Sequence, residues 1–374
     1  MKKIVVNTRW LRKNAMDGIG WFTYNTLQYI VQNNPSITFH FLFDSGIKEE
    51  FLFGKNVVPH NLFPPAKHAA LNVIWFEVSC RILLNKINPD LFLSPDGICC
   101  LGWKGRQYAV IHDLNFIYYP KDLKFTNRIY YNYFIKKSAE KATRIGTVSD
   151  FSKQDLVKKY KIAPSKIDVV YNGINSFFIP LREDEKKSVK NKYSNGNDYF
   201  LFVGTLHPRK NILRLLQAFE SFKNGSKSNI QLLIAGKELY RTDELHAYHQ
   251  SMNHHADVRF LGRLPDADLQ AVMSSAYCLV YVPYFEGFGI PIVEAMNSRV
   301  PVITSNVTSM PEIAGDAALI VDPFNINEIA DGMEIIATNE EVRQNYITKG
   351  IQRAADFSWK QTAELLWNGI VQCL

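Results

Sequence analysis

The stretch YCLVYVPYFEGFGIPIVE, residues 277–294, combines a strand, a glycine-bearing loop and the start of a helix. The apolar run at 277–283 is typical of a buried strand. Gly287 and Gly289 allow the following backbone to approach a ligand closely, and Pro291 is compatible with a helix only in its first turn. The amide N–H groups at such a helix start point the same way along the helix dipole. The stretch therefore predicts an anion-binding site.

Two glutamates flank this loop. Glu286 precedes the expected helix and Glu294 lies inside it, so the two do not share one helical face. We expect them to contact two parts of one extended ligand. Carboxylates suit sugar hydroxyls because each accepts two or more hydrogen bonds, which the charge strengthens. The alternative, for an isolated Glu-Gly-x-Gly after a strand, is a plain turn followed by a helix.

Strand-like and helix-like runs alternate twice along the 374 residues. Continuous apolar strands separated by helices indicate a parallel sheet that is covered on both faces. A chain of this length accommodates about two domains. We predict an α/β protein with two doubly wound, Rossmann-like domains. The expected parts are an N-terminal domain, a polar linker, a C-terminal domain and a final helix, at residues 1–180, 181–198, 199–355 and 356–374.

The polar residues that could bind a ligand or take part in catalysis follow strands. Ligands of doubly wound sheets bind beyond the carboxyl ends of the strands. We expect those ends to face one another across a cleft between the two domains. Four features would then line that cleft: Gly18–Gly20, His112–Asp113, Arg209–Lys210 and Glu286.

Two adjacent cations, Arg209 and Lys210, lie in VGTLHPRKN (203–211), before a helix that we expect to begin near Asn211. Two positive charges beside a helix N-terminus match a diphosphate. They would also neutralise the charge that develops on a leaving phosphate. An exposed Arg-Lys turn is the alternative.

Gly18-Ile19-Gly20 is half of a dinucleotide-binding fingerprint, but Thr23 occupies the third glycine position. The segment therefore favours a loop close to a phosphate over a hydride-transfer site, and a plain turn fits it as well. His112 ends the strand-like run YAVIH. It could bond a sugar hydroxyl or relay a proton, and a hydrogen-bonded structural histidine is the alternative.

Asp266-Ala267-Asp268 matches the pattern of a DxD metal motif. It follows Pro265 at an expected helix start, where aspartates cap free N–H groups, so we expect capping and no metal. The five cysteines form no CxxC motif and no regular framework. Their number and spacing predict buried thiols in a reducing cytosol.

Charge is distributed unevenly. Residues 1–180 carry 24 Lys and Arg against 13 Asp and Glu, whereas the remainder carries 19 against 23. Much of the excess falls between Lys121 and Lys166, where RIYYNYFIKK (128–137) adds aromatic residues. Such a surface can attract anionic lipid, and a solvated helix face over an aromatic core is the alternative. No recognition motif for nucleic acid accompanies the charge, so we expect no nucleic-acid partner.

The first residues, MKKIVVNTRW, have too short an apolar run for a signal peptide, and no run of about 18 apolar residues predicts a membrane span. We expect a cytoplasmic protein, with peripheral contact to the inner leaflet of the plasma membrane as a hypothesis from its charge.

Three motifs resemble those of the retaining, nucleotide-sugar-dependent glycosyltransferases of family four, which have the two-domain GT-B fold. They are EGFGIPIVE, VGTLHPRKN and TSNVTSMPEIAGDAALIVDP (304–323), and the order of elements is similar over nearly the whole chain. The resemblance implies that the first domain faces the acceptor and the second binds the nucleotide sugar. It also implies that the final helix packs back on the first domain, and that no cofactor is needed.

The E-x7-E pattern of this family maps onto Glu286 and Glu294. The resemblance implies that Glu286 contacts the donor sugar near the reacting carbon and that Glu294 holds the ribose. His112 would touch the donor sugar and Lys210 the diphosphate. The other contacts to the nucleotide sugar implied by the resemblance come from Gly20, Gly287, Phe288, Gly289 and Ile290.

One position departs from the family pattern. Many relatives carry a second phosphate-binding arginine directly after the glycine of the phosphate strand, where this chain has Thr205. Arg209 is the candidate to replace that arginine, and Thr205 remains a candidate contact.

The resemblance implies transfer of a hexose, with retained configuration and without a metal, from a nucleotide diphosphate sugar. The acceptor would be a glycan or a lipid-linked oligosaccharide in the synthesis of a cell-surface polysaccharide such as lipopolysaccharide. The similar segments of mannosyl- and rhamnosyl-type enzymes make mannose a candidate. No residue stands out as a nucleophile for a double displacement, so we expect front-face substitution. The alternatives are a non-catalytic sugar-nucleotide-binding protein and another GT-B enzyme, such as a sugar-nucleotide epimerase or a phosphorylase.

Overall fold

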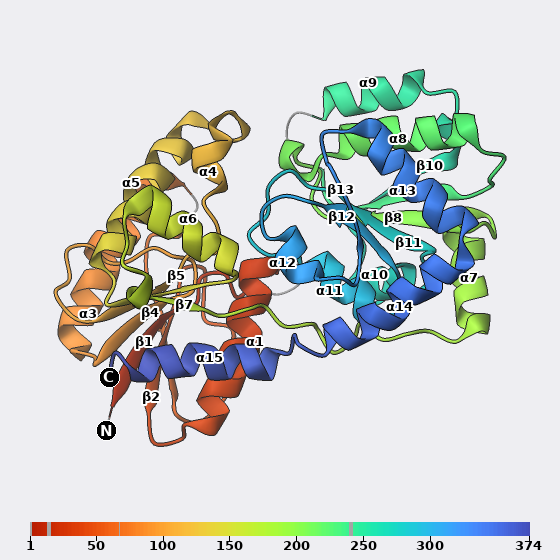
Figure 1. Cartoon of the computed structure of the whole chain (residues 1–374). Helices are drawn as coiled ribbons and strands as arrows, with labels where there is room; N and C mark the ends of the chain where they lie inside the picture. The colour runs from red at the N-terminus through yellow and green to blue at the C-terminus, as the bar shows by residue number, and fades with distance from the viewer. Residues whose placement is uncertain (1, 13–15, 67, 239–241) are drawn as a thin grey trace. The chain divides into compact units, whose positions relative to one another are not determined.

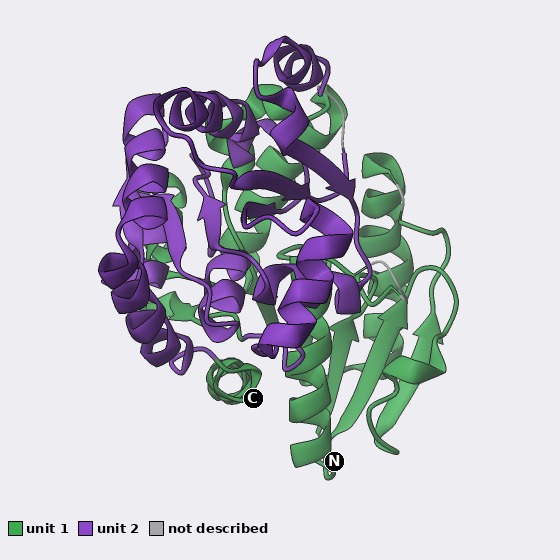
Figure 2. Ribbon diagram, turned by 90° about the vertical axis from the view of Figure 1, so that its right-hand side faces the viewer, with its two compact units in different colours: residues 1–173, 358–374 green, residues 174–357 purple. Residues whose placement is uncertain are grey.

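The computed structural model describes residues 2–12, 16–66, 68–238 and 242–374. The chain forms two compact units, and Figure 2 shows each in its own colour. Unit 1 comprises Met1–Gly173 and Ser358–Leu374, and unit 2 comprises Ile174–Phe357. Each unit is built around one parallel sheet. The prediction of two doubly wound α/β domains is therefore confirmed.

The sheet of unit 1 has the strand order β3-β2-β1-β4-β5-β6-β7, and every described pairing is parallel. The order reverses between β1 and β4, which is where doubly wound sheets bind ligands. The strands are β1 Lys3–Asn7, β2 Thr38–Phe43, β3 Val57–Asn61, β4 Leu91–Ser94, β5 Gln107–Val110, β6 Arg144–Thr147 and β7 Ile167–Val169.

Helices cover both faces of this sheet, as the alternation of buried side chains along β1 requires. Ile4 and Val6 pack in a core with α1 and α15, whereas Val5 packs in a core with the helices between 69 and 160. The segment 69–87 is one run of helix with a π-helical middle, Trp75–Cys80. The α-helices of unit 1 are α1 Gly18–Asn33, α2 Ala69–Ile74, α3 Arg81–Ile87, α4 Asn115–Tyr118, α5 Phe125–Lys141, α6 Asp150–Tyr160 and α15 Trp359–Val371.

The C-terminal helix α15 belongs to unit 1 although it follows unit 2 in the chain (Figures 1 and 2). Its buried side chains, Leu366 and Ile370 among them, pack in the same core as α1. The phenol of Tyr29 on α1 donates a hydrogen bond of 2.9 Å to Glu364 on α15. The apolar face of α15 thus completes one side of the first sheet.

The sheet of unit 2 has the order β10-β9-β8-β11-β12-β13, also parallel, and its order reverses between β8 and β11. Its strands are β8 Tyr199–Val203, β9 Gln231–Ala235, β10 Val258–Gly262, β11 Cys278–Tyr281, β12 Val302–Ser305 and β13 Leu319–Val321. Its α-helices are α7 Glu183–Ser194, α8 Ile212–Gly225, α9 Asp243–Ser251, α10 Asp266–Ser274, α11 Ile290–Asn297, α12 Met310–Ala314, α13 Ile326–Thr338 and α14 Glu340–Ala354.

The boundary between the units differs from the expected one. Unit 2 already begins at Ile174, and most of the segment expected as a linker, 181–198, forms helix α7 inside unit 2. This helix packs against α10, and the ammonium of Lys190 donates a 2.6 Å hydrogen bond to Asp198. Because α7 has almost no buried residues, its sequence is as polar as that of a linker. This polar composition explains why the expected boundary differs from the observed one.

Candidate functional site

The loop between β11 and α11 is held in place by polar side chains from three neighbouring segments of unit 2. The amide of Asn211 donates to the carbonyl of Val282 at 3.0 Å, and the hydroxyl of Ser305 donates to that of Pro283 at 2.7 Å. The hydroxyl of Ser309 donates to the carbonyl of Glu286 at 3.0 Å. These three bonds fix the backbone before the two glycines, so the loop is preorganised.

Gly289 is the residue before α11, and only glycine fits this position. Its φ is +97°, in the left-handed region, and a Cβ there would lie 2.7 Å from the terminal methyl of Met310. Ile290 opens the helix and Pro291 lies in its first turn, as the sequence predicted. The start of this helix therefore follows Glu286 by only a few residues.

Glu286 is the centre of a buried ionic cluster. Its carboxylate forms ion pairs with both Arg209 and Lys210, which lie on the short helix Pro208–Lys210 after β8. Arg209 also donates to the carbonyl of Phe285 at 3.1 Å. The ammonium of Lys210 donates to the phenol of Tyr281 at 2.5 Å. Lys210 as a whole is only 9% exposed. Two cations against one carboxylate give the cluster an excess positive charge, which suits an anionic ligand.

The two cations determine the protonation state of Glu286. Burial by itself would raise the pKa of this carboxyl, but the charges and hydrogen bonds of Arg209 and Lys210 outweigh burial and lower the pKa to about 2. Glu286 is therefore a carboxylate throughout the physiological range. A group with so low a pKa is a poor general base near pH 7, so it is better suited to orienting hydroxyls and balancing positive charge.

Glu294, eight residues later on α11, has the opposite character. Its side chain is buried, and burial, together with the negative charge of Asp266, raises its pKa well above the ordinary value. The fold therefore favours the protonated form of Glu294 more than water does. A neutral carboxyl group both donates and accepts hydrogen bonds, as a sugar hydroxyl does.

Replacing Glu294 with Gln is expected to stabilise unit 2 at pH 7 and to raise its Tm. The folded state binds a proton here that the unfolded state releases above its ordinary pKa, so the stability of the parent protein falls as the pH rises beyond about 4.5. Glutamine has no proton to take up. Calorimetric melting at pH 4 and pH 7 measures the effect, and an equal difference at both pH values would contradict it.

The melting transition of unit 2 can be identified in such an experiment. All six tryptophans belong to unit 1, so the fluorescence of tryptophan follows unit 1 alone. The calorimetric transition that fluorescence does not detect is then that of unit 2. The six residues are Trp10, Trp21, Trp75, Trp103, Trp359 and Trp367.

Thr205 lies in the loop after β8, between Gly204 and the short helix that carries both cations. Gly204 has a φ of +148°, and a Cβ on Gly236 would lie 1.8 Å from the Gly204 carbonyl oxygen. The ends of β8 and β9 therefore approach each other more closely than side chains would allow. Thr205 lies in the loop that leads from this point to the short helix with Arg209 and Lys210.

In unit 1, His112 is half-buried just beyond β5, and the carbonyl of Pro95 is 2.8 Å from its Nε2. A carbonyl only accepts hydrogen bonds, so Nε2 carries the proton and Nδ1 of the neutral ring has a lone pair. Burial lowers the pKa of His112, which favours the neutral ring. The ring of Phe22 on α1 meets the imidazole edge to face, with centroids 5.2 Å apart.

Gly20 lies in the first turn of α1, and the expectation of a glycine loop at 18–20 is wrong in this respect. Asp17 caps the helix by accepting a 3.0 Å hydrogen bond from the amide of Gly20. A Cβ on Gly20 would lie 3.0 Å from the carbonyl oxygen of Trp10, so the glycine permits close packing here.

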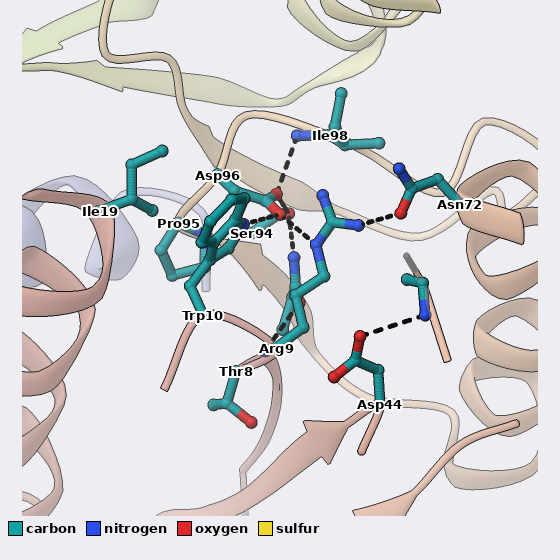
Figure 3. A network of polar contacts seen from close by, with 12 residues as sticks. Thr8, Arg9, Trp10, Ile19, Asp44, Asn72, Ser94, Pro95, Asp96 and Ile98 are labelled. Atoms are coloured by element: carbon teal, nitrogen blue, oxygen red, sulfur yellow. Dashed lines mark hydrogen bonds and ion pairs between the residues drawn. The ribbon is translucent and has the colours of Figure 1, made fainter. Parts of the chain in front are cut away.

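Beside these residues the carboxyl ends of β1 and β4 carry a buried polar network, shown in Figure 3. The guanidinium of Arg9 donates to Asp96 at 2.6 Å and to Asn72 at 2.5 Å. Asp96 also accepts hydrogen bonds from the indole of Trp10 at 3.0 Å and from the hydroxyl of Ser94 at 3.0 Å. The charge of Arg9, together with these bonds, lowers the pKa of Asp96 although burial opposes this. The network fixes the segment that contains Pro95, the partner of His112.

The candidate residues thus form two groups, each within its own unit. Unit 2 brings Arg209 and Lys210 onto Glu286, with Glu294 on the next helix. Unit 1 places His112 against α1, the helix that begins with Gly18–Gly20. Sequence reasoning missed Tyr281, Ser309, and the pair of Arg9 and Asp96. Nothing in the sequence indicated them, because each acts through a partner far away in the chain.

The DxD segment lies in the first turn of α10, but its aspartates do not cap the helix as expected. Pro265 precedes the helix and no side chain caps it, so the capping prediction is wrong in detail. Asp266 and Asp268 lie in the first turn, where they favour the helix dipole, and Asp268 pairs with Lys192 at 3.2 Å. Within the described ranges, no three His, Cys, Asp or Glu side chains gather closely enough to hold a metal ion. All five cysteines are buried and none forms a disulfide, as predicted.

Two family profiles match this chain, one on each half. The profile described as "Glycosyltransferase Family 4" matches residues 16–176, and "Glycosyl transferases group 1" matches residues 183–353. The chain is 33% identical over 261 residues to O-antigen chain mannosyltransferase B of Escherichia coli, a match covering 68% of this chain and 67% of the relative. It is also 33% identical over 275 residues to O-antigen chain mannosyltransferase RfbU of Salmonella typhimurium, covering 71% of each.

Solved structures support the same fold. Sucrose-phosphate synthase from Thermosynechococcus elongatus matches with a TM-score of 0.80 and 17% identity, covering 100% of this chain and 99% of that one. HepE of Anabaena in complex with UDP-glucose matches with a TM-score of 0.76 and 15% identity, covering both chains completely. WaaG, a glycosyltransferase involved in lipopolysaccharide biosynthesis, matches with a TM-score of 0.76 and 15% identity, over 96% of this chain and 97% of that one. At these identities the likeness shows the fold, which is the GT-B fold.

Proposed function

We propose that this chain, which belongs to glycosyltransferase family 4, transfers a hexose from a nucleotide diphosphate sugar to a glycan or lipid-linked acceptor. The reaction proceeds with retention and without a metal ion, in the synthesis of a cell-surface polysaccharide. The ionic cluster of Arg209, Lys210 and Glu286 carries this proposal. The O-antigen mannosyltransferases among the relatives support mannose as the transferred sugar.

The cluster has the charges that a sugar diphosphate requires. Arg209 and Lys210 would pair with the diphosphate, which brings two or more negative charges to two cations that now share one carboxylate. Glu286 would then be released from part of its pairing and accept hydrogen bonds from the sugar hydroxyls. The role expected for Arg209, as the substitute for an arginine at position 205, is supported by its direct contact with Glu286.

The chemical step is a front-face substitution. The bond between the anomeric carbon and the phosphate oxygen breaks while the acceptor oxygen bonds to the same carbon from the same side. The proton of the acceptor hydroxyl passes to the leaving phosphate. Arg209 and Lys210 stabilise the negative charge that develops on this phosphate, and the Glu286 carboxylate stabilises the oxocarbenium-like sugar. The low pKa of Glu286 supports an orienting and electrostatic role over that of a base.

The remaining candidates would fix the donor. Glu294 would hold the ribose, and the amides of residues 287–290 the sugar and phosphate. His112 has its Nε2 bonded to Pro95, so Nδ1 is the atom we assign to a donor-sugar hydroxyl. Gly20 at the N-terminus of α1 and Thr205 beside the two cations complete the proposed contacts to the phosphates.

Titration calorimetry against GDP, UDP, ADP and dTDP in the presence of EDTA tests the proposal. We expect micromolar binding of GDP, in keeping with a mannose donor. Incubation with the matching nucleotide sugar should then release nucleoside diphosphate, and NMR of the product should show the configuration of the donor. Binding without any hydrolysis or transfer would instead support a non-catalytic sugar-nucleotide-binding protein. Conversion of the donor without an acceptor would support an epimerase.

Replacing Lys210 with Ala is expected to weaken the binding of the nucleoside diphosphate about 10- to 100-fold. A hydrogen bond to a charged group contributes about 1.5–3 kcal/mol, and about 1.4 kcal/mol corresponds to a tenfold change in affinity. The same calorimetric titration measures the change. Lys187→Ala on α7, an exposed lysine of the same unit, is the matched control. Equal affinities for Lys210→Ala and the control would refute the phosphate role.

A further inference from the structure

Tyr281, the last residue of β11, brings a phenol to the ionic cluster of unit 2. Its side chain is fully buried. The ammonium of Lys210 donates a hydrogen bond of 2.5 Å to the phenol oxygen, and Lys210 is paired with Glu286 at the same time. The phenol also forms a hydrogen bond with Glu286 itself. Tyr281, Lys210 and Glu286 therefore form a closed triangle of polar contacts.

The direction of each hydrogen bond in this triangle follows from the protonation of its members. Burial raises the pKa of Tyr281, and the charge of Glu286 and the hydrogen bond to it raise this pKa further, against the opposing charge of Arg209. The phenol therefore keeps its proton at neutral pH. An ammonium only donates and a carboxylate only accepts, so the phenol oxygen accepts from Lys210 and the phenol O–H donates to Glu286. Glu286 thus has a neutral donor beside the two cations.

The ring of Tyr281 is held by the sheet. It stacks on Phe202 of β8, with the ring centroids 5.9 Å apart and the planes inclined by 26°. Tyr281 also pairs with Thr304 of β12, and the hydroxyl of Thr304 donates to the Tyr281 carbonyl at 2.7 Å. The strands on both sides of β11 therefore fix the phenol in place, whether or not a ligand occupies the cluster.

The two cations differ from the phenol because they have a second partner in the proposed function. A diphosphate that pairs with Arg209 and Lys210 competes with Glu286 for the same positive charges. The Glu286 carboxylate then loses part of the pairing that holds it. The O–H of Tyr281 is carried by a ring that the sheet fixes, so it stays beside the carboxylate when the cations turn to the diphosphate.

We propose that Tyr281 is a positioning residue for sugar transfer, whose phenol holds the Glu286 carboxylate in place while the diphosphate occupies Arg209 and Lys210. This role rests on the proposed function. Glu286 acts on the sugar in the transition state, whereas the nucleotide is bound by other groups. Loss of the phenol should therefore lower the rate of transfer without weakening the binding of the nucleotide.

Tyr281→Phe tests this role, because it removes the hydroxyl and keeps the ring that stacks on Phe202. We expect kcat for transfer to fall about 10- to 100-fold, as the loss of a hydrogen bond to a charged group would cause. The KM for the nucleotide sugar and the Kd for the nucleoside diphosphate should change less than about threefold. Steady-state kinetics and calorimetric titration measure these constants. An unchanged kcat overturns the proposal, and so does a weaker affinity at unchanged kcat, which would show that the phenol acts through Lys210.

Tyr199→Phe is the matched control. Tyr199 on β8 is also fully buried, and its phenol donates to the backbone carbonyl of Val272 at 2.6 Å, outside the ionic cluster. The control therefore removes a buried phenol hydrogen bond from the same unit. It should lower the Tm of unit 2 and leave kcat unchanged. An equal fall in kcat in both variants would show a general effect of lost hydrogen bonding in the core and would overturn the proposal.

A double-mutant cycle with Glu286→Ala tests whether the phenol acts through the glutamate. In the Glu286→Ala background, Tyr281→Phe should lower kcat less than about twofold, because the carboxylate that the phenol holds is absent. A further fall as large as the one in the parent would overturn the proposal. The parent protein separates this failure from that of the proposed function. Absence of transfer by the parent refutes the function and the role together, whereas transfer that Tyr281→Phe leaves intact refutes only the role of Tyr281.

Discussion

Glu286→Gln is expected to lower the rate of sugar transfer about 100- to 1000-fold and to leave the affinity for the nucleoside diphosphate unchanged or slightly increased. The carboxylate acts on the sugar in the transition state, whereas the nucleotide is held by other groups. Its removal leaves Arg209 and Lys210 without their shared counter-ion, so the diphosphate meets more positive charge than in the parent. Steady-state kinetics and calorimetric titration on the same preparation measure the two effects.

Replacing one of the two cations is expected to affect nucleotide affinity rather than only the rate of transfer. Lys210→Ala should lose nucleotide affinity, so the two variants together separate catalysis from binding. Glu286→Gln with equal losses in turnover and in nucleotide affinity would show that the glutamate acts only by holding the two cations in place. Because the pKa of Glu286 is lowered to about 2, the parent should also keep its ionised carboxylate, and with it this contribution to the rate, from pH 5 to pH 8. An inflection from this group inside that range would contradict the assignment.

The fold was predictable because its decisive signals are local. The strands of unit 2, such as Tyr199–Val203 and Cys278–Tyr281, are fully buried apolar runs, and each is followed by a helix with recognisable start signals. Helix α7 was not predictable in the same way. It is stabilised by acids in its first turn and by contacts to α10, so its sequence is as polar as that of a linker.

The sequence predicted which residues belong to the site, but it did not predict which of them contact one another. The sequence singled out Glu286, Arg209 and Lys210, yet 76 or 77 residues separate the glutamate from the cations. Their contact depends on β8 and β11 being neighbours in the sheet, and pairing of parallel strands is a tertiary property. The opposite directions in which the pKa values of Glu286 and Glu294 shift follow from burial and from these contacts. Spacing alone therefore gave no indication of them.

Asp96→Ala is expected to destabilise unit 1 by about 3–5 kcal/mol. The side chains of Arg9 and Asp96 are 6% and 3% exposed. The variant leaves the guanidinium buried without its carboxylate partner. Of the side-chain acceptors that Figure 3 shows for this guanidinium, only the amide oxygen of Asn72 then remains. The pair itself spans 87 residues and depends on β1 lying beside β4. Urea unfolding followed by tryptophan fluorescence measures the loss in unit 1, where all six tryptophans lie.

A double variant separates the buried charge from the lost contact. Replacing both partners, Arg9→Met with Asp96→Leu, removes the uncompensated charge and should recover most of the stability, since apolar residues of similar volume often replace a buried ion pair without loss. The pair also fixes the segment of Pro95, whose carbonyl accepts from His112. The double variant should therefore fold well and still lose transfer activity through a displaced His112. Full activity would show that the network serves stability alone, and a double variant as unstable as Asp96→Ala would show that packing, not buried charge, explains the loss.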